Sequence, residues 1–365
     1  MILKELINHL ELIAPLSLQE DYDNSGLIAG RPDLEITAAL ISLDCTEEIV
    51  DEAIRKGCNL VISHHPIVFK GLKKFNGKTY VERVIIKAIK NDIALYAIHT
   101  NLDHIQRGVN FKICEKLGLK NPTILSPKED ILKKLVTYAP LDQASVIRSA
   151  LFSAGAGKIG NYSDCSFNAE GYGTFKASED ANPYVGEKGE VHQEKETRIE
   201  VIFSAYQESK IVSALKEAHP YEEVAYDIYS LANRHENIGA GMIASLETAM
   251  SELDFLKMVK EKLKATVIRY TTLREKPVSR VAVCGGSGSF LLENAIAAKA
   301  DVFITADFKY HEFFDAEKKI VIADVGHFES EQFTQELLYE IIQKKFPNFA
   351  LHLTEYNTNP INYLI

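Results

Sequence analysis

Short apolar runs alternate with amphipathic segments along the first part of the chain. An apolar run at 38–44 is followed by an amphipathic stretch at 46–57 and by a second apolar run at 59–63. This order predicts two parallel strands, because a crossover helix returns the chain to the same edge of a sheet. A helix at 81–91 and a strand at 93–100 continue the alternation. We therefore expect an α/β layer.

The rhythm changes near Pro127, where strands and helices no longer alternate one by one. The pattern predicts a strand, a helix, one or two strands, a polar loop, a strand, a helix and a strand, in the order 133–140, 141–157, 162–175, 177–196, 197–205, 208–220 and 222–231. This sequence of elements is close to β-α-β-β-α-β, the ferredoxin-like order. We expect an inserted α+β domain at 128–232.

After residue 232 the alternation of strands and helices resumes. The predicted elements are a strand, a helix, four strands with helical segments between the later ones, and a final helix, at 238–247, 251–265, 265–271, 279–285, 301–307, 319–325 and 330–346. The fold class is therefore α/β, with one parallel-rich domain built from both chain halves, 1–127 and 233–365, around the insertion.

Composition narrows the class of protein. The chain has 365 residues, of which 46% are hydrophobic, and a formal charge of −10, which argues against nucleic-acid binding and binding to an anionic membrane. No run approaches the ~18 apolar residues that a membrane span needs. Five scattered cysteines without a C-x-x-C pair fit a reducing compartment, so we expect a cytoplasmic protein.

Three predicted strands are followed by residues of the types that commonly bind metals. The first is followed by His64, His65 and Pro66. Pro66 ends the strand, so both imidazoles fall in a turn from which they can reach one cavity. Two half-exposed turn histidines would give the same pattern.

The second strand runs into His99, Asp103 and His104, and the third is followed by Gly326, His327 and Glu331. Asp103 offers a hard oxygen ligand beside imidazole nitrogens. The spacing of four residues puts the last two ligands on one face of a helix. The second segment could instead be a helix N-cap or a polar turn. In the third, His327 could be a helix cap and Glu331 an acidic residue that interacts with the helix dipole.

The combination favours metal binding. Sites in open parallel sheets form beyond the carboxyl ends of the strands, and all three clusters lie there. His64, His65, Asp103, His327 and Glu331 are too many ligands for one tetrahedral ion. They suit two divalent ions with Glu331 as the bridge, ~3.5–4 Å apart. Zinc, manganese, iron and cobalt all accept such ligands.

Other segments carry weaker signals. Cys284–Ser289 is glycine-rich between a strand and a helix, and its amides could cradle phosphate, although a tight turn needs glycine as well. Asp23–Gly26 is a turn that could line the cavity. Asp44 ends a strand and could support a ligand. His219–Glu223 in the insertion is more typical of a helix stop than of a ligand set.

The motifs together resemble a known family. SHHP, HTNLD and GHFESE, with DNSGL near the N-terminus and HPYEEVAYD in the insertion, resemble the Nif-three-like family of dinuclear-metal proteins. The resemblance covers nearly the whole chain, including an insertion that longer, mostly bacterial members carry. It implies the same five ligands, with Glu331 shared. It also implies a hexameric ring built from trimers, with a PII/CutA-like inserted domain.

Family members are commonly named for GTP cyclohydrolase 1 type 2, which implies that metal-bound hydroxide opens the imidazole ring of GTP. The leading hypothesis is a metal-dependent hydrolase of a small molecule, possibly a nucleotide, with His99, Asp44 or His104 as candidates for proton transfer or ligand support. A nucleotide phosphoesterase is the nearest alternative. A non-catalytic metal-binding adaptor, regulator or metallochaperone is another, and a ring that threads nucleic acid is discouraged by the charge.

Overall fold

The computed structural model describes residues 1–364. Two stretches of the chain, Met1–Pro127 and the part from Glu236 onward, fold together as one unit, and Lys128–His235 forms a second unit. The first unit, which the sequence predicted as one α/β domain built from both chain halves, contains two sheets.

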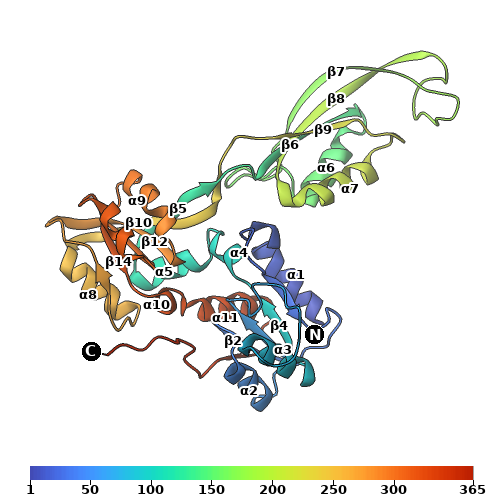
Figure 1. Ribbon diagram of the computed structural model, residues 1–365. Coiled ribbons are helices and arrows are strands. Elements are labelled where there is room, and N and C mark those ends of the chain that lie inside the picture. The colour runs from blue at the N-terminus through green and yellow to red at the C-terminus, as the bar shows by residue number, and fades with distance from the viewer. Residues whose placement is uncertain (365) are drawn as a thin grey trace. The chain divides into compact units, whose positions relative to one another are not determined.

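The first sheet follows the predicted β-α-β rhythm (Figure 1). Its order is β1-β4-β3-β2-β15, with β1 (Gly26–Ala29), β2 (Ala38–Ser42), β3 (Leu60–Ser63), β4 (Ala94–Ala97) and β15 (Ala350–Leu353). Strands β15, β2, β3 and β4 are parallel, and β1 pairs antiparallel with β4. Strand β15, which the sequence did not predict, joins this sheet from the far end of the chain.

Helices enclose the core of this sheet. They are α1 (Leu3–Ile13), α2 (Glu47–Arg55), α3 (Tyr80–Lys90) and α11 (Thr334–Lys345). Apolar residues of α2 and α3 pack against the strands in one buried cluster that includes Ile49, Val84, Leu40, Val61 and Leu95. Strands β2, β3 and β4 are buried along their whole length, which explains why they read as continuous apolar runs.

The second sheet has the order β11-β14-β13-β12-β10-β5. Strands β12 (Pro277–Ser287), β13 (Val302–Ala306) and β14 (Val321–Asp324) are parallel. They are flanked by β10 (His235–Ser251), β5 (Lys120–Lys128) and the two-residue β11 (Arg269–Tyr270). Its helices are α5 (Val109–Leu117), α8 (Glu252–Lys262) and α9 (Leu292–Ala297).

Two short helices lie at the ends of parallel strands. Helix α4 (Thr100–Asp103) follows β4, and α10 (His327–Glu331) follows β14. The predicted continuous helix at 330–346 is wrong, because α10 ends at Glu331 and α11 begins at Thr334. The intervening turn lets α10 contact β12 and β13 of the second sheet while α11 contacts β2 and β15 of the first.

The second unit has one antiparallel sheet of order β7-β8-β6-β9, with α6 and α7 on one side of it (Figure 1). Its elements are β6 (Leu132–Pro140), α6 (Ala144–Ala154), β7 (Phe167–Lys176), β8 (Val191–Ser204), α7 (Glu208–Ala218) and β9 (Tyr226–Ser230). The element order is the predicted β-α-β-β-α-β. The loop predicted at 177–196 is shorter than expected, because pairing with β7 extends β8 back to Val191 despite its polar composition.

None of the described helices is long and apolar enough to cross a bilayer. All five cysteines are free, and four of them are buried.

Candidate metal centre

His64 and His65 lie at the carboxyl end of β3, as predicted. Their backbone amides donate to Ser42 O and Leu43 O, and the pair lies in the bend that directly follows Ser63, the last residue of β3. Their rings lie 5.0 Å apart between centroids, and the planes differ by 42°. His64 is fully buried, and the side chain of His65 is 16% exposed. His65 therefore lines the cavity, and His64 lies buried directly beside it.

The second segment is anchored by Asp23, from the DNSGL motif. One carboxylate oxygen of Asp23 accepts from His99 Nδ1 at 2.8 Å, and the other accepts from the Thr100 amide at 3.1 Å. These bonds fix the turn in which β4 ends and α4 begins, and α4 carries Asp103. Asp23 thus positions His99, while the burial of Asp103 is set by the short helix.

The third segment is positioned by glycine. Gly326 has a φ of +97° and precedes His327, which starts α10. One helical turn later, Glu331 is 3% exposed. Gly286, at the end of β12, has a φ of +61°, and a Cβ there would lie 2.4 Å from Glu331 Oε1. Only a residue without a side chain leaves room for this carboxylate.

The three segments meet at Glu331, whose two oxygens face different partners. Oε2 lies 3.0 Å from His65 Nε2 and 3.0 Å from His327 Nε2. Oε1 lies 3.9 Å from His64 Nε2, which is 3.6 Å from Asp103 Oδ1. Three overlapping groups have ligand atoms within 4.8 Å of one another: His65, His327 and Glu331; His64, Asp103 and Glu331; and His64, His65 and His99.

Each imidazole is held through Nδ1. His64 Nδ1 donates to Ile98 O at 2.8 Å, His65 Nδ1 donates to Asp44 at 2.8 Å, and His327 Nδ1 donates to Asp307 at 2.7 Å. Such bonds fix the ring and direct Nε2 towards a metal. The arrangement of all three rings is therefore the one found around metal-bound histidines.

The hydrogen bonding of two buried atoms shows whether a cation would fit the cluster. Among the described residues, His64 Nε2 and Asp103 Oδ1 are buried without a hydrogen-bond partner. Because His64 Nδ1 donates to a carbonyl, Nε2 carries a lone pair, and the facing carboxylate oxygen is also an acceptor. Two buried acceptors that face each other are costly unless a cation lies between them. The residues present therefore fit a metal ion.

The cluster opens into a pocket of about 960 Å³. It is lined by four of the five ligand residues, His65, Asp103, His327 and Glu331, and by segments from both sheets of the first unit, including Thr358–Ile361 near the C-terminus. Exposed aromatic residues lie along it, namely Tyr22, Phe69, Tyr80 and Phe290. A pocket of this size next to the cluster is typical of a small-molecule site.

Comparison with known proteins identifies the family. The sequence profile of the Duf34/NIF3 (NGG1p interacting factor 3) family matches residues 1–360. The chain belongs to the DUF34/NIF3 family. It is 38% identical to a GTP cyclohydrolase 1 type 2 homolog of Halalkalibacterium halodurans over 98% of both chains. It is 36% identical to one of Bacillus subtilis, over 99% of this chain and 98% of the other.

Solved structures of NIF3 relatives have the same fold. A Bacillus cereus protein related to NIF3 is 38% identical and superposes with a TM-score of 0.86, covering 100% of this chain and 99% of that one. A Staphylococcus aureus protein is 32% identical, with a TM-score of 0.79 and the same coverage. The α/β class and the predicted family resemblance are thus confirmed.

In this DUF34/NIF3 protein the cluster attracts positive charge. Burial would lower the pKa of His65 and His327, but neighbouring carboxylates raise it to about 9 and about 11. Burial raises the pKa of Asp103 to about 7, and the charge on Glu331 adds to the effect. Burial opposes ionisation of Glu331, yet the neighbouring His327 and His65 hold its pKa well below the usual range. A divalent cation would satisfy these carboxylates in place of protons.

The remaining predicted residues of this NIF3 protein fall around the cluster in different roles. Asp44 accepts from His65 Nδ1 and from Thr358 Oγ1, so it supports a ligand. His104 lies outside the three groups, with Nδ1 bonded to Leu18 O and Nε2 3.1 Å from Glu20. Both ring nitrogens of His104 are thus engaged. His99 is the candidate whose ring lies with the ligands.

The glycine-rich segment at 284–289 is not the free phosphate loop that its sequence allows. Strand β12 continues to Ser287. The Gly285 amide donates to Asn110 Oδ1, and the Gly286 amide donates to Ser330 Oγ, both at 2.9 Å. The glycines serve instead to let Glu331 approach the strand.

Sequence reasoning missed Asp307, which supports His327. It follows β13 directly, and an acidic residue at the carboxyl end of a parallel strand was the available signal. The aromatic residues along the pocket gave no signal, because they are scattered along the sequence without a shared spacing.

Proposed function

We propose that the protein is a cytoplasmic hydrolase that depends on two divalent metal ions. Glu331 would bridge them, with His65 and His327 holding one ion and His64 and Asp103 the other. The observation that carries the proposal is the carboxylate of Glu331, which is buried and presents one oxygen to each pair of ligands. Zinc, manganese, iron and cobalt all suit this ligand set.

Two bound ions would supply an activated water and polarise a substrate oxygen. The chain itself supplies a proton acceptor beside them. His99 Nδ1 donates to the Asp23 carboxylate, so Nε2 carries the lone pair. An imidazole oriented in this way by a carboxylate is suited to general-base work. Phe69 packs edge-on against the same ring at 5.6 Å and limits its exposure to water.

The pocket supports a nucleotide as the substrate. Exposed Tyr22, Phe69 and Phe290 offer faces on which a planar base can stack. No Lys or Arg occurs among the described residues that line the pocket, whereas Glu20 and Asp44 do. Phosphate charge would therefore have to be neutralised at the metals. GTP is the named candidate because several relatives are called GTP cyclohydrolase 1 type 2 homologs.

The pocket also favours an enzyme over a protein that only stores or carries metal. A structural metal site closes its ligand shell, whereas a catalytic site keeps a position open. The ligand cluster here borders a cavity of about 960 Å³. An adaptor or metallochaperone is the outcome to be expected if metal binds without turnover.

The test combines metal content with turnover. Elemental analysis of the purified wild-type protein should give two divalent ions per chain. The Glu331→Ala variant should lose both ions and any hydrolysis of GTP or other nucleotides, whereas the Glu293→Ala variant, with an exposed glutamate on α9, should keep both. One ion or none in the wild type would overturn the dinuclear site. Two ions without turnover of any nucleotide would leave the site and refute the hydrolase.

We also propose that the protein assembles as a hexamer of two trimers, in line with the family resemblance. Light scattering coupled to size exclusion measures the mass directly, and a monomer or dimer would contradict the proposal.

A further inference from the structure

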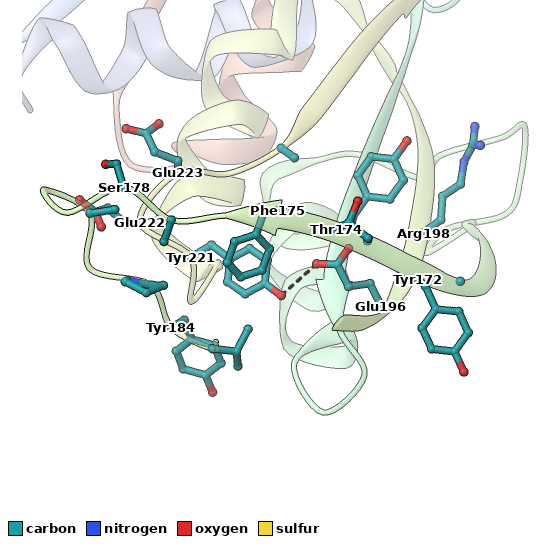
Figure 2. Close-up of a pocket in the computed structure, with 18 of the residues that line it drawn as sticks. Tyr172, Thr174, Phe175, Ser178, Tyr184, Glu196, Arg198, Tyr221, Glu222 and Glu223 are labelled. Carbon is teal, nitrogen blue, oxygen red and sulfur yellow. Dashed lines mark hydrogen bonds between the residues drawn. The ribbon is translucent and has the colours of Figure 1, made fainter. Parts of the chain in front are cut away.

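The unit Lys128–His235 contains a pocket of its own, of about 770 Å³ (Figure 2). Its walls are the β7–β8 hairpin, the segment that follows β7, and the turn between α7 and β9. Aromatic side chains line it, among them Tyr138, Tyr172, Phe175, Tyr184 and Tyr221. A cavity of this size and lining is in the range that holds a small organic molecule.

The HPYEE segment, expected to be a helix stop, builds one wall of this pocket. His219 is 7% exposed, its Nε2 donates to Tyr138 O at 2.9 Å, and its Nδ1 accepts from the Tyr221 amide at 3.1 Å. A neutral ring that uses both nitrogens in this way locks the turn to β6. The turn thereby directs Tyr221 into the pocket, where its ring lies 6.1 Å from that of Tyr184.

A carboxylate is held at the centre of the pocket. Tyr221 donates its hydroxyl to Glu196 Oε1 at 2.9 Å, and Figure 2 shows this bond between the two labelled side chains. The other oxygen, Oε2, lies close to Gly173: a Cβ added to that glycine would be only 2.2 Å from it. The glycine therefore leaves room for the carboxylate. The hydrogen bond from Tyr221 and the space left by Gly173 thus define the position of Glu196 in the pocket.

Negative charge dominates the lining. Arg198 is the only Lys or Arg among the described lining residues, and its guanidinium pairs with Glu200 at 3.0 Å. Five carboxylates line the same pocket. They are Glu170, Asp180, Glu196, Glu222 and Glu223. Glu170 pairs with Lys195, and the other four form no ion pair with a Lys or Arg among the described residues.

We propose that this pocket is a second ligand site, which binds a small organic ammonium ion. Aromatic faces attract ammonium groups through the ring quadrupole, and carboxylates add a Coulombic attraction. Tyr184 and Tyr221 supply the faces, and Glu196 supplies the oriented charge. An anionic ligand such as a nucleotide would meet four carboxylates and is disfavoured here. The site is thus chemically distinct from the metal centre.

Choline and spermidine are the probes for the full-length protein, titrated by calorimetry and ligand-observed NMR at physiological salt. The control ligand is 3,3-dimethylbutan-1-ol, which has the shape of choline without its charge. Choline should bind at least tenfold more tightly than the alcohol, because only the cation gains from the rings and the carboxylates.

Single substitutions locate the binding. Tyr184→Ala removes a half-exposed loop ring, and its matched control is Tyr229→Ala, since both tyrosines are 51% exposed and Tyr229 lies outside the pocket. Glu196→Gln keeps an acceptor for Tyr221 and removes the charge, with Glu187→Gln as the control. Each pocket variant should weaken choline binding about fivefold to tenfold, and each control should leave it unchanged. Binding should also persist in Glu331→Ala, which separates this site from the metal centre.

Three results would overturn the proposal. The first is that neither choline nor spermidine binds at millimolar concentration. The second is that the alcohol binds as tightly as choline, which would indicate an apolar cavity without charge selection. The third is that the control substitutions weaken binding as much as Tyr184→Ala and Glu196→Gln do. Circular dichroism of each variant shows that lost binding does not reflect unfolding.

Discussion

Replacing Gly286 with alanine should damage the metal centre without removing any ligand. The new Cβ would lie 2.4 Å from Glu331 Oε1 and 3.2 Å from His327 Cε1. Ordinary contact begins near 3.4 Å, so the carboxylate would have to move by about 1 Å. Metal–oxygen bonds are only ~2.0–2.2 Å long. A shift of this size would break the bridge between the two proposed ions.

The magnitude has two parts that a control separates. Gly286 has a φ of +61°, and alanine in that left-handed region costs roughly 1–2 kcal/mol of unfolding free energy. Overpacking against the buried carboxylate adds about 1–3 kcal/mol. Gly118 at the end of α5 has a φ of +73° with nothing within 4 Å of its Cβ position. Gly118→Ala should therefore carry the backbone cost alone.

Urea unfolding gives the two free energies, and calorimetric titration of chelator-treated protein with zinc or manganese gives the affinities. Gly286→Ala should lose roughly tenfold to a hundredfold in metal affinity, the usual effect of disturbing the surroundings of a metal. Gly118→Ala should bind metal as the wild type does. Wild-type affinity and two ions per chain in Gly286→Ala would refute the reasoning, and so would equal loss of metal in both variants.

Three further predictions concern residues that support the cluster. Asp44→Asn should lower metal affinity about tenfold, because Asp44 orients His65 through Nδ1; a calorimetric titration checks this against the exposed control Asp92→Asn. In chelator-treated protein the pKa of His65 is about 9, since neighbouring carboxylates outweigh burial. The stability from that proton is fully present below pH ~6.5 and lost as the pH rises through about 9, so the melting temperature should fall over this interval, and a flat profile would contradict the assignment. Asp23→Asn should reduce the free energy of unfolding by roughly 2–3 kcal/mol, because a buried carboxylate bonded to His99 loses its charge; chemical denaturation yielding less than about 0.5 kcal/mol would show that Asp23 anchors nothing.

Much of the candidate site was predictable because its chemistry is local in the sequence. Parallel strands expose their carboxyl ends at one edge, so ligand-type residues directly after a buried apolar run are candidates wherever that run lies. This rule identifies His64, Asp103 and Glu331 from the sequence alone. The helical spacing of His327 and Glu331 was also enough to put them on one face.

The local sequence pattern does not determine how segments distant in the chain lie relative to one another. The position of a residue after a strand does not show that His64 and His327 follow strands of two different sheets, because strands and helices alternate in the same way in both. Nor does it separate His99, which lies with the ligands, from His104, which is bonded to Leu18 O. The two histidines are close in sequence, and only the direction of each ring after the turn distinguishes them.

Backbone geometry explains the remaining differences. A glycine-rich strand end suggests phosphate binding until Gly286 is seen to lie against Glu331. The HPYEE segment does end a helix, α7, as its sequence suggests, and the same turn places Tyr221 on Glu196 across a pocket. Residue type and spacing determined which chemistry this chain could carry, since each depends on neighbours within a few positions. The meeting of segments far apart in the chain, such as His65 and Glu331, which are 266 residues apart, was decided by the packing of whole sheets, which no short pattern encodes.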